Sequence, residues 1–196
     1  MHAGGAATVD GTRYRISPVF TVLATQNPVE FEGTYPLPEA QRDRFLMKIE
    51  IDYPAREDEA RIVSAYASGR RLHEEAATAV EPVMSREELG ESRLTVARAV
   101  RVEPGIQSYI LDIVTATRKD DSVELGAGPR ASLALLDTAR ARAALLGRDF
   151  VTPDDVKVLA EAVLTHRVTL SPEAEMEGTS LSDVLRRIFD RVEVPR

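Results

Sequence analysis

Three polar side chains have the types and positions that phosphate chemistry needs. Asn27 follows a short apolar run, Arg44 comes 44 − 27 = 17 positions later in the stretch RDRF, and Arg130 lies in the stretch GAGPRAS. An Asn amide both donates and accepts, so it can hold a water and a phosphate oxygen together. An arginine offered to a neighbouring active site can raise a phosphoryl-transfer rate by about 10³–10⁵. Arg130 stands in the first turn of a predicted helix, where a cation opposes the helix dipole but can meet an anion drawn to the same place.

Each of these residues also has a plainer explanation. Asn27 precedes a proline, and that dipeptide is common in turns. Arg42 and Arg44 could be surface arginines paired with Asp43 or Glu39, which would stabilise the chain by under ~1 kcal/mol. The glycines of GAGPRAS could form an ordinary loop. Spacing alone favours the plainer explanation for the Asn and the RDRF arginines, and it leaves the two interpretations of GAGPRAS balanced.

Composition excludes several classes of function. The chain has 196 residues, a net charge of −7 and no Cys, and its three His are far apart in sequence. It therefore has no disulfide framework or thiolate metal site, and we predict no metal site. No apolar run approaches the ~20 residues of a membrane helix, and the first residues show no signal pattern. We expect a cytoplasmic protein with no membrane or nucleic-acid partner, since an acidic chain neutralises phosphates poorly.

The first part of the chain predicts strands. Asp10-Gly11 between short β-prone pieces indicates a hairpin. The apolar run at 19–24 is typical of a strand buried in a parallel sheet, and residues 45–51 predict another strand. Buried parallel strands need helices on both faces, and about 50 residues cannot supply them. We therefore expect residues 1–55 to be the last part of a larger α/β unit.

The sequence after Pro54 predicts helices throughout. Helix starts are indicated by Ser85 with a Glu three residues later, by Thr152 followed by Pro-Asp-Asp, and by Ser180 with an Asp three residues later. We predict a second, helical domain at 56–196. Its expected apolar faces carry Ile62, Val63 and Tyr66; Ile106, Ile110, Ile113 and Val114; Leu133, Leu136, Ala139, Ala143 and Leu146; Val156, Leu159 and Val163; and Leu181, Leu185, Ile188 and Val192.

Several stretches resemble one family in the same order. ATQNPVEFEGTYPLPEAQRDRF is similar to the segment that defines the MoxR family of AAA+ ATPases, which are relatives of the magnesium-chelatase ATPase subunits. GAGPRASLALL, GRDFVTPDDVKVLA and VLTHRV resemble that family's helical lid. The resemblance runs from about Thr8 to the end of the chain. It implies an α/β remnant, the C-terminal strands of a P-loop AAA+ core, followed by an all-α helical lid domain.

The resemblance also implies roles for the polar residues. Asn27 matches sensor 1, which reads the terminal phosphate of the nucleotide and orients the attacking water. Arg44 matches the arginine finger, which enters the site of the adjacent subunit, and Arg130 matches sensor 2 on the lid. Arg42 stands where the family has an apolar residue such as Leu, so it stays open which of the two RDRF arginines points at the neighbour.

The phosphate-binding loop of such an ATPase is missing from the sequence. A P-loop ends in Gly-Lys, and no Gly in this chain precedes a Lys. The Asp-Glu of a Walker B strand follows apolar residues, whereas the one Asp-Glu pair here, Asp58-Glu59, lies among charges. We therefore expect ATP and Mg²⁺ to bind only with the missing N-terminal core, and the chain alone to be inactive. A truncated gene, a misassigned start codon or an expressed fragment would each explain where it begins.

The resemblance further implies a homo-oligomeric ring, a chaperone-like remodelling role and von Willebrand A domain proteins as partners. Two other hypotheses remain. The chain could be a stand-alone helical protein-interaction module without hydrolysis. Less in keeping with its charge, it could bind nucleic acid through Arg-rich helices such as RRIFDR and TARARAALLGR.

Overall fold

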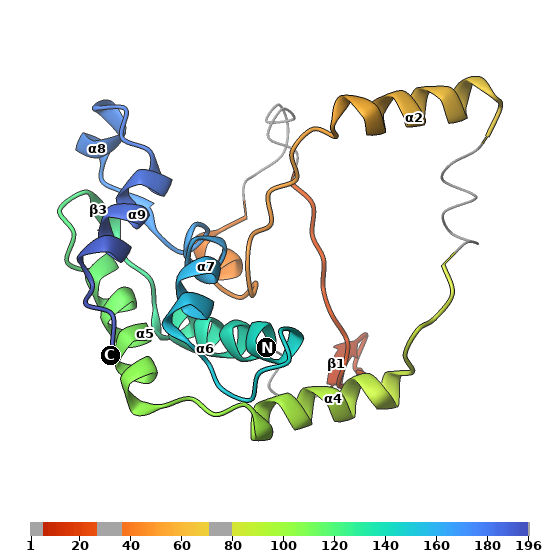
Figure 1. Cartoon of the computed structure of the whole chain (residues 1–196), viewed down its shortest axis with the longest axis horizontal. Helices are drawn as coiled ribbons and strands as arrows, with labels where there is room; N and C mark the ends of the chain where they lie inside the picture. Colours follow the sequence, from red (N-terminus) through yellow and green to blue (C-terminus); the bar gives the residue numbers. More distant parts are fainter. Residues whose placement is uncertain (1–5, 27–36, 71–79, 196) are drawn as a thin grey trace.

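The computed structural model describes residues 6–26, 37–70 and 80–195. A hairpin and an extended segment come first, and a group of packed helices follows (Figure 1). The elements are β1 (Ala6–Val9), β2 (Thr12–Arg15), α1 (Glu39–Arg42), α2 (Arg56–Ala67), α4 (Arg86–Ala99), α5 (Pro104–Thr117), β3 (Val123–Leu125), α6 (Pro129–Leu145), α7 (Pro153–Leu164), β4 (Thr169–Leu170), α8 (Pro172–Met176) and α9 (Leu181–Arg191). The expected class, short strands followed by a mostly helical part, is confirmed.

The predicted hairpin at Asp10-Gly11 is confirmed. Strands β1 and β2 pair antiparallel, with Val9 opposite Thr12. Asp10 has φ 50° and Gly11 has φ 79°, and a two-residue turn of this hand needs positive φ at both central residues. The hairpin lies beside α4 (Figure 1), and Arg93 of α4 donates to the Pro18 carbonyl at 3.1 Å.

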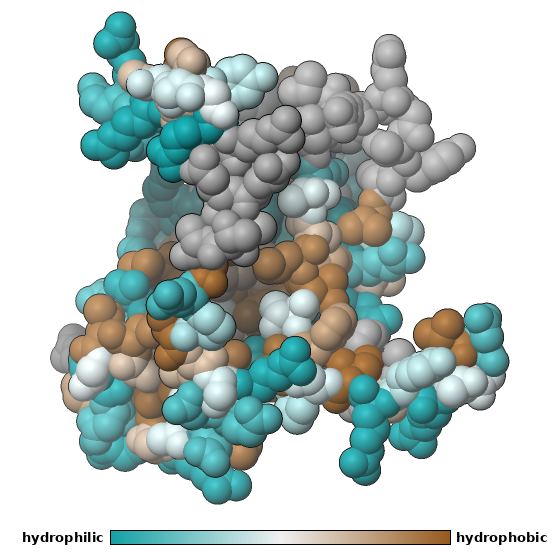
Figure 2. All heavy atoms as spheres, turned by 90° about the vertical axis from the view of Figure 1, so that its right-hand side faces the viewer, coloured by the Kyte–Doolittle hydropathy of each residue, from teal (hydrophilic) through white to brown (hydrophobic). Residues whose placement is uncertain are grey.

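The strands expected at 19–24 and 45–51 do not form. Both stretches have no regular secondary structure, and Leu23 and Ile51 are 89% and 92% exposed. A strand needs neighbours that satisfy its backbone N–H and C=O groups, and the described part of the chain places no strand beside either stretch. Figure 2 shows apolar side chains, in brown, gathered in the middle of the face seen from the side of α2.

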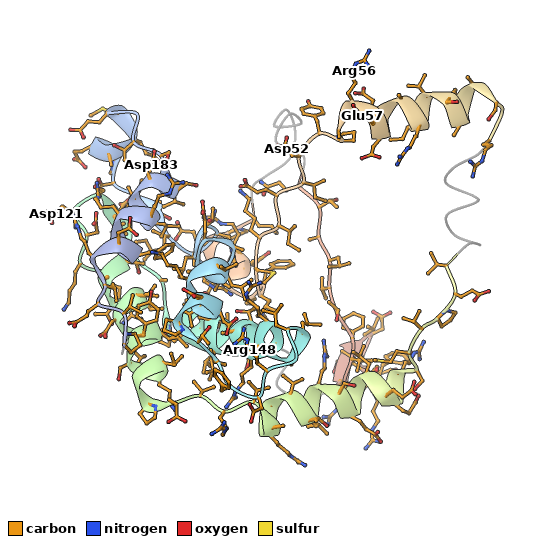
Figure 3. All side chains as sticks on the ribbon, viewed as in Figure 1. Asp52, Arg56, Glu57, Asp121, Arg148 and Asp183 are labelled. Carbon is orange, nitrogen blue, oxygen red and sulfur yellow. The ribbon has the colours of Figure 1, made fainter. Side chains whose placement is uncertain are left out.

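Helix α2 forms where it was expected, but nothing in the described residues covers its apolar face. Ile62, Val63 and Tyr66 are all exposed. The helix lies apart from α5–α9, and its first residues Arg56 and Glu57 point away from them (Figures 1 and 3). The boundary predicted at residue 55 stays a prediction, although α2 begins directly after it.

The core of the molecule lies between α5, α6, α7 and α9. Ile113, Leu135, Leu164 and Leu185 are fully buried there. Helices α6 and α7 form a helical hairpin, and α6 turns small side chains inward, which lets the two backbones approach closely. These small residues are Ala131, Ala134, Ala139 and Ala143.

The predicted apolar faces of α5, α7 and α9 are confirmed, whereas that of α6 is partly wrong. Leu133 and Leu146 are exposed, and Leu135 is buried in their place. Helix α6 carries Ala or Leu around much of its circumference, so spacing three and four apart did not single out one face. A two-stranded pairing between β3 and β4 was also missed.

The predicted helix starts are confirmed. Ser85 and Glu88 form a capping box, with bonds of 2.7 and 3.1 Å. Ser180 accepts from the Asp183 amide at 3.1 Å. At Thr152, the Asp155 carboxylate accepts from both the backbone N–H and the hydroxyl at 2.9 Å. These bonds satisfy amides that the first turn of a helix leaves without partners.

Candidate functional site

The RDRF turn (Arg42–Phe45) ends helix α1. Asp43 and Phe45 donate backbone N–H bonds to the Glu39 and Arg42 carbonyls at 2.9 and 3.0 Å, which closes the turn. Arg44 is exposed, whereas Arg42 is half-buried and lies 3.8 Å from Glu39. The two arginines of the turn are therefore not equivalent, and Arg44 extends further into solvent.

Arg167, just past the end of α7, holds the RDRF turn against the lid. Its side chain is 3% exposed, and its Nε donates to Asp43 Oδ1 at 3.2 Å. Its other nitrogens donate to the Leu46 carbonyl at 3.0 Å and to the Phe45 carbonyl. Burial lowers the pKa of Arg167, and Asp43 partly offsets this effect. A forked guanidinium suits such a site because it can donate in several directions at once.

His166 adds a second contact to the same turn. Its Nε2 lies 3.2 Å from the Phe45 carbonyl, which can only accept, so Nε2 carries the proton. Burial lowers the pKa of His166, and the charge of Arg167 lowers it further. The ring is therefore neutral at neutral pH. Beyond the turn, the Lys48 amide donates to the Ala162 carbonyl of α7 at 2.8 Å, which continues the junction.

Arg130 reaches the RDRF turn from the other helix of the hairpin. It follows Gly128 and Pro129 at the start of α6, and its Nη1 lies 3.0 Å from Asp43 Oδ2. Its side chain is 61% exposed. Two lid arginines thus share one carboxylate of the turn, although the pairs Asp43–Arg130 and Asp43–Arg167 are separated by 87 and 124 residues in sequence.

The loop before α6 is fixed by bonds that place Arg130. The buried Thr117 hydroxyl accepts from the Ala127 amide at 3.0 Å, and Arg118 donates to the Ala127 carbonyl at 2.8 Å. A Cβ at Gly126 would lie 2.7 Å from the Arg118 Cα, so the loop passes close only because this residue is glycine. The loop before α6 therefore packs closely against the end of α5 at Gly126.

The structure brings two of the three predicted site residues to one place. Arg44 belongs to the RDRF turn, and Arg130 is bonded to Asp43 of that turn. Asn27 lies outside the described residues. The sequence reading missed Asp43 and the two residues of the THRV stretch, His166 and Arg167. The sequence did contain a signal for His166 and Arg167, because the stretch VLTHRV resembles the lid of the family. Without the fold, however, a buried arginine cannot be distinguished from a surface arginine.

Two other charge clusters in the described residues join neighbouring elements of the helical part. Arg148, at the turn between α6 and α7 (Figure 3), donates to both oxygens of Asp155 at 2.6 and 2.7 Å. Burial acts to raise the pKa of Asp155, but the bonds from Arg148 and Thr152 outweigh it and the pKa is lowered. Asp120 accepts from Arg187 and Arg191 of α9. Among the described residues, no three acidic, His or Cys side chains are grouped closely enough to hold a metal ion.

Comparison with known proteins matches two regions of the chain to known families. Residues 3–47 match the model of the ATPase family associated with various cellular activities (AAA), and residues 115–188 match that of the AAA lid domain. Chaperone MoxR1 of Mycobacterium tuberculosis is 36% identical over 202 aligned residues, which cover 96% of this chain and 50% of that protein. The chain belongs to the MoxR family of AAA ATPases.

Two further relatives support this assignment. The MoxR-family chain is 43% identical to the uncharacterized protein YeaC of Bacillus subtilis over 97% of its own length and 58% of that protein. A crystal structure from Cytophaga hutchinsonii, provisionally described as an ATPase, superposes with a TM-score of 0.86 at 34% identity, over 98% of this chain and 59% of that one. The chain thus spans about half the length of the curated relatives that it matches.

In this MoxR-family chain, the RDRF turn lies at the end of the AAA match, and Arg130 and Arg167 lie within the lid match. The junction described above is therefore the junction between the two matched regions. None of the described helices is both long and apolar enough to cross a membrane.

Proposed function

We infer that this chain contributes residues to two nucleotide sites of a MoxR-type ATPase ring, its own site and that of a neighbouring subunit. Arg44 would be the arginine finger that stabilises transition-state charge in the neighbouring subunit, and Arg130 would be the sensor 2 residue that touches the phosphates in its own subunit. Asn27 would orient the attacking water as sensor 1. The observation that carries the proposal is the meeting of the RDRF turn and Arg130 at Asp43.

The exposed arginines fit a phosphate ligand. Arg130 already binds an anionic carboxylate and is 61% exposed, so a phosphate oxygen can take the same donor. Arg44 is the more exposed arginine of the RDRF turn, which supports Arg44 as the finger. ATP with Mg²⁺ would supply the transferable phosphoryl group, and this chain alone lacks a Gly-Lys loop to cradle it.

The first test uses the chain alone. We expect no ATP turnover, and isothermal titration with Mg-ATP to give no tight saturable heat, because arginines cannot replace the amides of a P-loop. Tight binding would show that the nucleotide site is complete within these residues.

The second test joins this chain to the residues of YeaC that precede its matched region. The fusion should hydrolyse ATP. Arg44→Ala should abolish turnover and leave ATP affinity largely intact, whereas Arg42→Ala, the control within the same turn, should retain most turnover. Mixing the Arg44→Ala fusion with one whose P-loop lysine is replaced should partly restore turnover, because the second copy brings an intact finger to the intact site of the first. An absence of rescue would count against a finger that acts in trans.

We also propose the wider role that the family resemblance implies, which is chaperone-like remodelling in the cytoplasm with a von Willebrand A domain protein as partner. The name of the mycobacterial relative, a chaperone, supports the first part. Pull-down of this chain with a purified von Willebrand A domain from the same genome tests the second part. If neither the chain nor the fusion binds the domain, a von Willebrand A domain protein is excluded as the partner.

A helical interaction module without hydrolysis remains the second candidate, and the uncovered apolar face of α2 favours it. An inactive YeaC fusion that folds would support it. Nucleic-acid binding is disfavoured, because Arg186, Arg187 and Arg191 of α9 lie close to the carboxylates of Asp183 and Asp120.

A further inference from the structure

Asp43 is shared between two arginines that differ in how tightly they are held. Its Oδ1 accepts from Arg167 at 3.2 Å, and its Oδ2 accepts from Arg130 at 3.0 Å. The Arg167 side chain is 3% exposed and the Arg130 side chain is 61% exposed. Asp43 itself lies between Arg42 and Arg44, so its position sets that of the whole RDRF turn.

The bond to Arg167 is the permanent one. Arg167 also donates to the carbonyls of Phe45 and Leu46 and, on its own side, to that of Val163. If Arg167 moved away, the buried Val163 carbonyl and the part-buried Phe45 and Leu46 carbonyls would lose this donor, and leaving such an acceptor without a partner is costly. This guanidinium therefore stays in place whatever binds to the lid.

The bond to Arg130 is the exchangeable one. Water reaches both partners, so the pair is screened and weak. Arg130 stands at the start of α6 with no acidic residue in the first turn of that helix, and the dipole there favours an anion. A polyphosphate carries more charge than one carboxylate and can compete with Asp43 for the same guanidinium.

We propose that Asp43 is a positioning residue for the arginine finger. Arg167 anchors Asp43 to the lid, and Arg130 releases Asp43 when the Arg130 side chain turns to a phosphate. The proposal rests on the proposed role of Arg130 in phosphate binding. Without nucleotide, the RDRF turn is tied to the start of α6. With nucleotide, Asp43 keeps its bond to Arg167 and loses its bond to Arg130. The turn that carries Arg44 can then pivot about its Arg167 anchor toward a neighbouring subunit. Nucleotide in one site would thus control the finger offered to the next.

The test uses this chain labelled with ¹⁵N and titrated with inorganic triphosphate, followed by nuclear magnetic resonance. In the wild type, the Nε–H signal of Arg130 and the backbone amides of residues 43–46 should shift together with one saturation curve. The Arg101 signal is the matched control, because Arg101 is similarly exposed and lies 3.3 Å from a single aspartate, Asp149. It should stay unchanged.

Variants separate the bond from general charge effects. Asp43→Asn should tighten triphosphate binding at Arg130 by about two- to fivefold, since an exposed competing pair has been removed, and residues 44–46 should no longer respond. Glu39→Gln, which removes an equal charge from α1, should change the affinity less and keep the response. Asp43→Glu, which retains the carboxylate, should restore the response of residues 44–46.

Each result decides a different point. If triphosphate leaves Arg130 unchanged both in this chain and in the YeaC fusion, the sensor 2 role is overturned, and this inference is overturned with it. If Arg130 responds while residues 43–46 do not, or if Asp43→Asn behaves as the wild type, the coupling alone is overturned and the sensor 2 role stands. The wild-type titration reaches this decision by itself if a variant fails to fold.

Discussion

The lid helices and the segment that carries the RDRF turn are held by different forces. Helices α5, α6, α7 and α9 bury apolar side chains completely, with Ile113, Leu135 and Val163 at 0% exposure. No residue from 37 to 53 is buried. Met47 packs against the edge of the lid core, but most of the contacts of this segment with the lid are polar bonds, several of them from Arg167. Apolar packing is non-directional and makes the lid one cooperative body. The polar bonds of the junction are directional. They can therefore fix the position of the RDRF turn and still break without unfolding the lid helices.

The largest expected effect compares two isoleucines, one in each region. Ile113→Ala, at a fully buried position, should lower the free energy of unfolding by about 2–5 kcal/mol, because it removes apolar contact and leaves a cavity. Ile51→Ala, at a position 92% exposed, should change it by less than about 0.5 kcal/mol. Urea denaturation of both variants measures the difference. Equal losses would mean that residues 45–51 pack in solution as tightly as the lid.

A smaller effect is expected at the junction. Arg167→Lys keeps the charge but removes the fork, so one ammonium cannot serve Asp43 and the Phe45 and Leu46 carbonyls together. We expect a loss of about 1–3 kcal/mol and faster hydrogen exchange at residues 43–48, with protection in α5 and α9 unchanged. Arg186→Lys, at an exposed arginine with one carboxylate partner, is the control. Loss of lid protection together with the turn would show that the two regions unfold as one.

The pH dependence of the junction is expected to be weaker still. The pKa of His166 is lowered from its ordinary 6.5, by burial first and by Arg167 second. Between the folded pKa and about 6.5, the unfolded chain binds more protons, so stability falls as the pH falls through that window. His166→Gln should remove this part of the loss, and denaturation midpoints from about pH 7.5 to about pH 5 measure it. Parallel curves for the two proteins would contradict the assignment of a neutral, buried ring.

The smallest effect is expected at Arg130. Its pair with Asp43 is exposed, so Arg130→Gln should cost under ~1 kcal/mol in this chain. Arg101→Gln, at the similarly exposed pair with Asp149, should cost about as little. Thermal unfolding of both variants checks the prediction. A large loss at Arg130 alone would make it a structural residue and would weaken its proposed role toward phosphate.

Much of the lid was predictable because its signals are local. The capping residues at Ser85, Thr152 and Ser180 and the apolar faces of α5 and α9 depend on neighbours within the same helix. The strands expected at 19–24 and 45–51 failed because a strand depends on partners elsewhere, and the described residues supply none. Helix α6 was read incorrectly at Leu133 because an Ala-rich helix offers several similar faces.

The candidate site was predictable only in part, for the same reason. The stretches RDRF and GPRAS pointed to Arg44 and Arg130, but no sequence pattern shows that Arg130 and Arg167 meet at Asp43 across 87 and 124 residues. The roles carried over from the resemblance stay predictions, and Asn27 lies outside the described residues.

The two arginines that hold Asp43 lie at the same end of the α6–α7 hairpin, one at the start of α6 and the other just past the end of α7. Helix α6 has 17 residues, a length of about 25 Å at 1.5 Å per residue. If the lid, which is packed as one body, rotated by about 10° around Asp43, the opposite end of this hairpin would move through about 4 Å. An exchange of the hydrogen-bond partner of Asp43 would then cause its largest displacement at the far end of the hairpin, about 25 Å from the bond that changes.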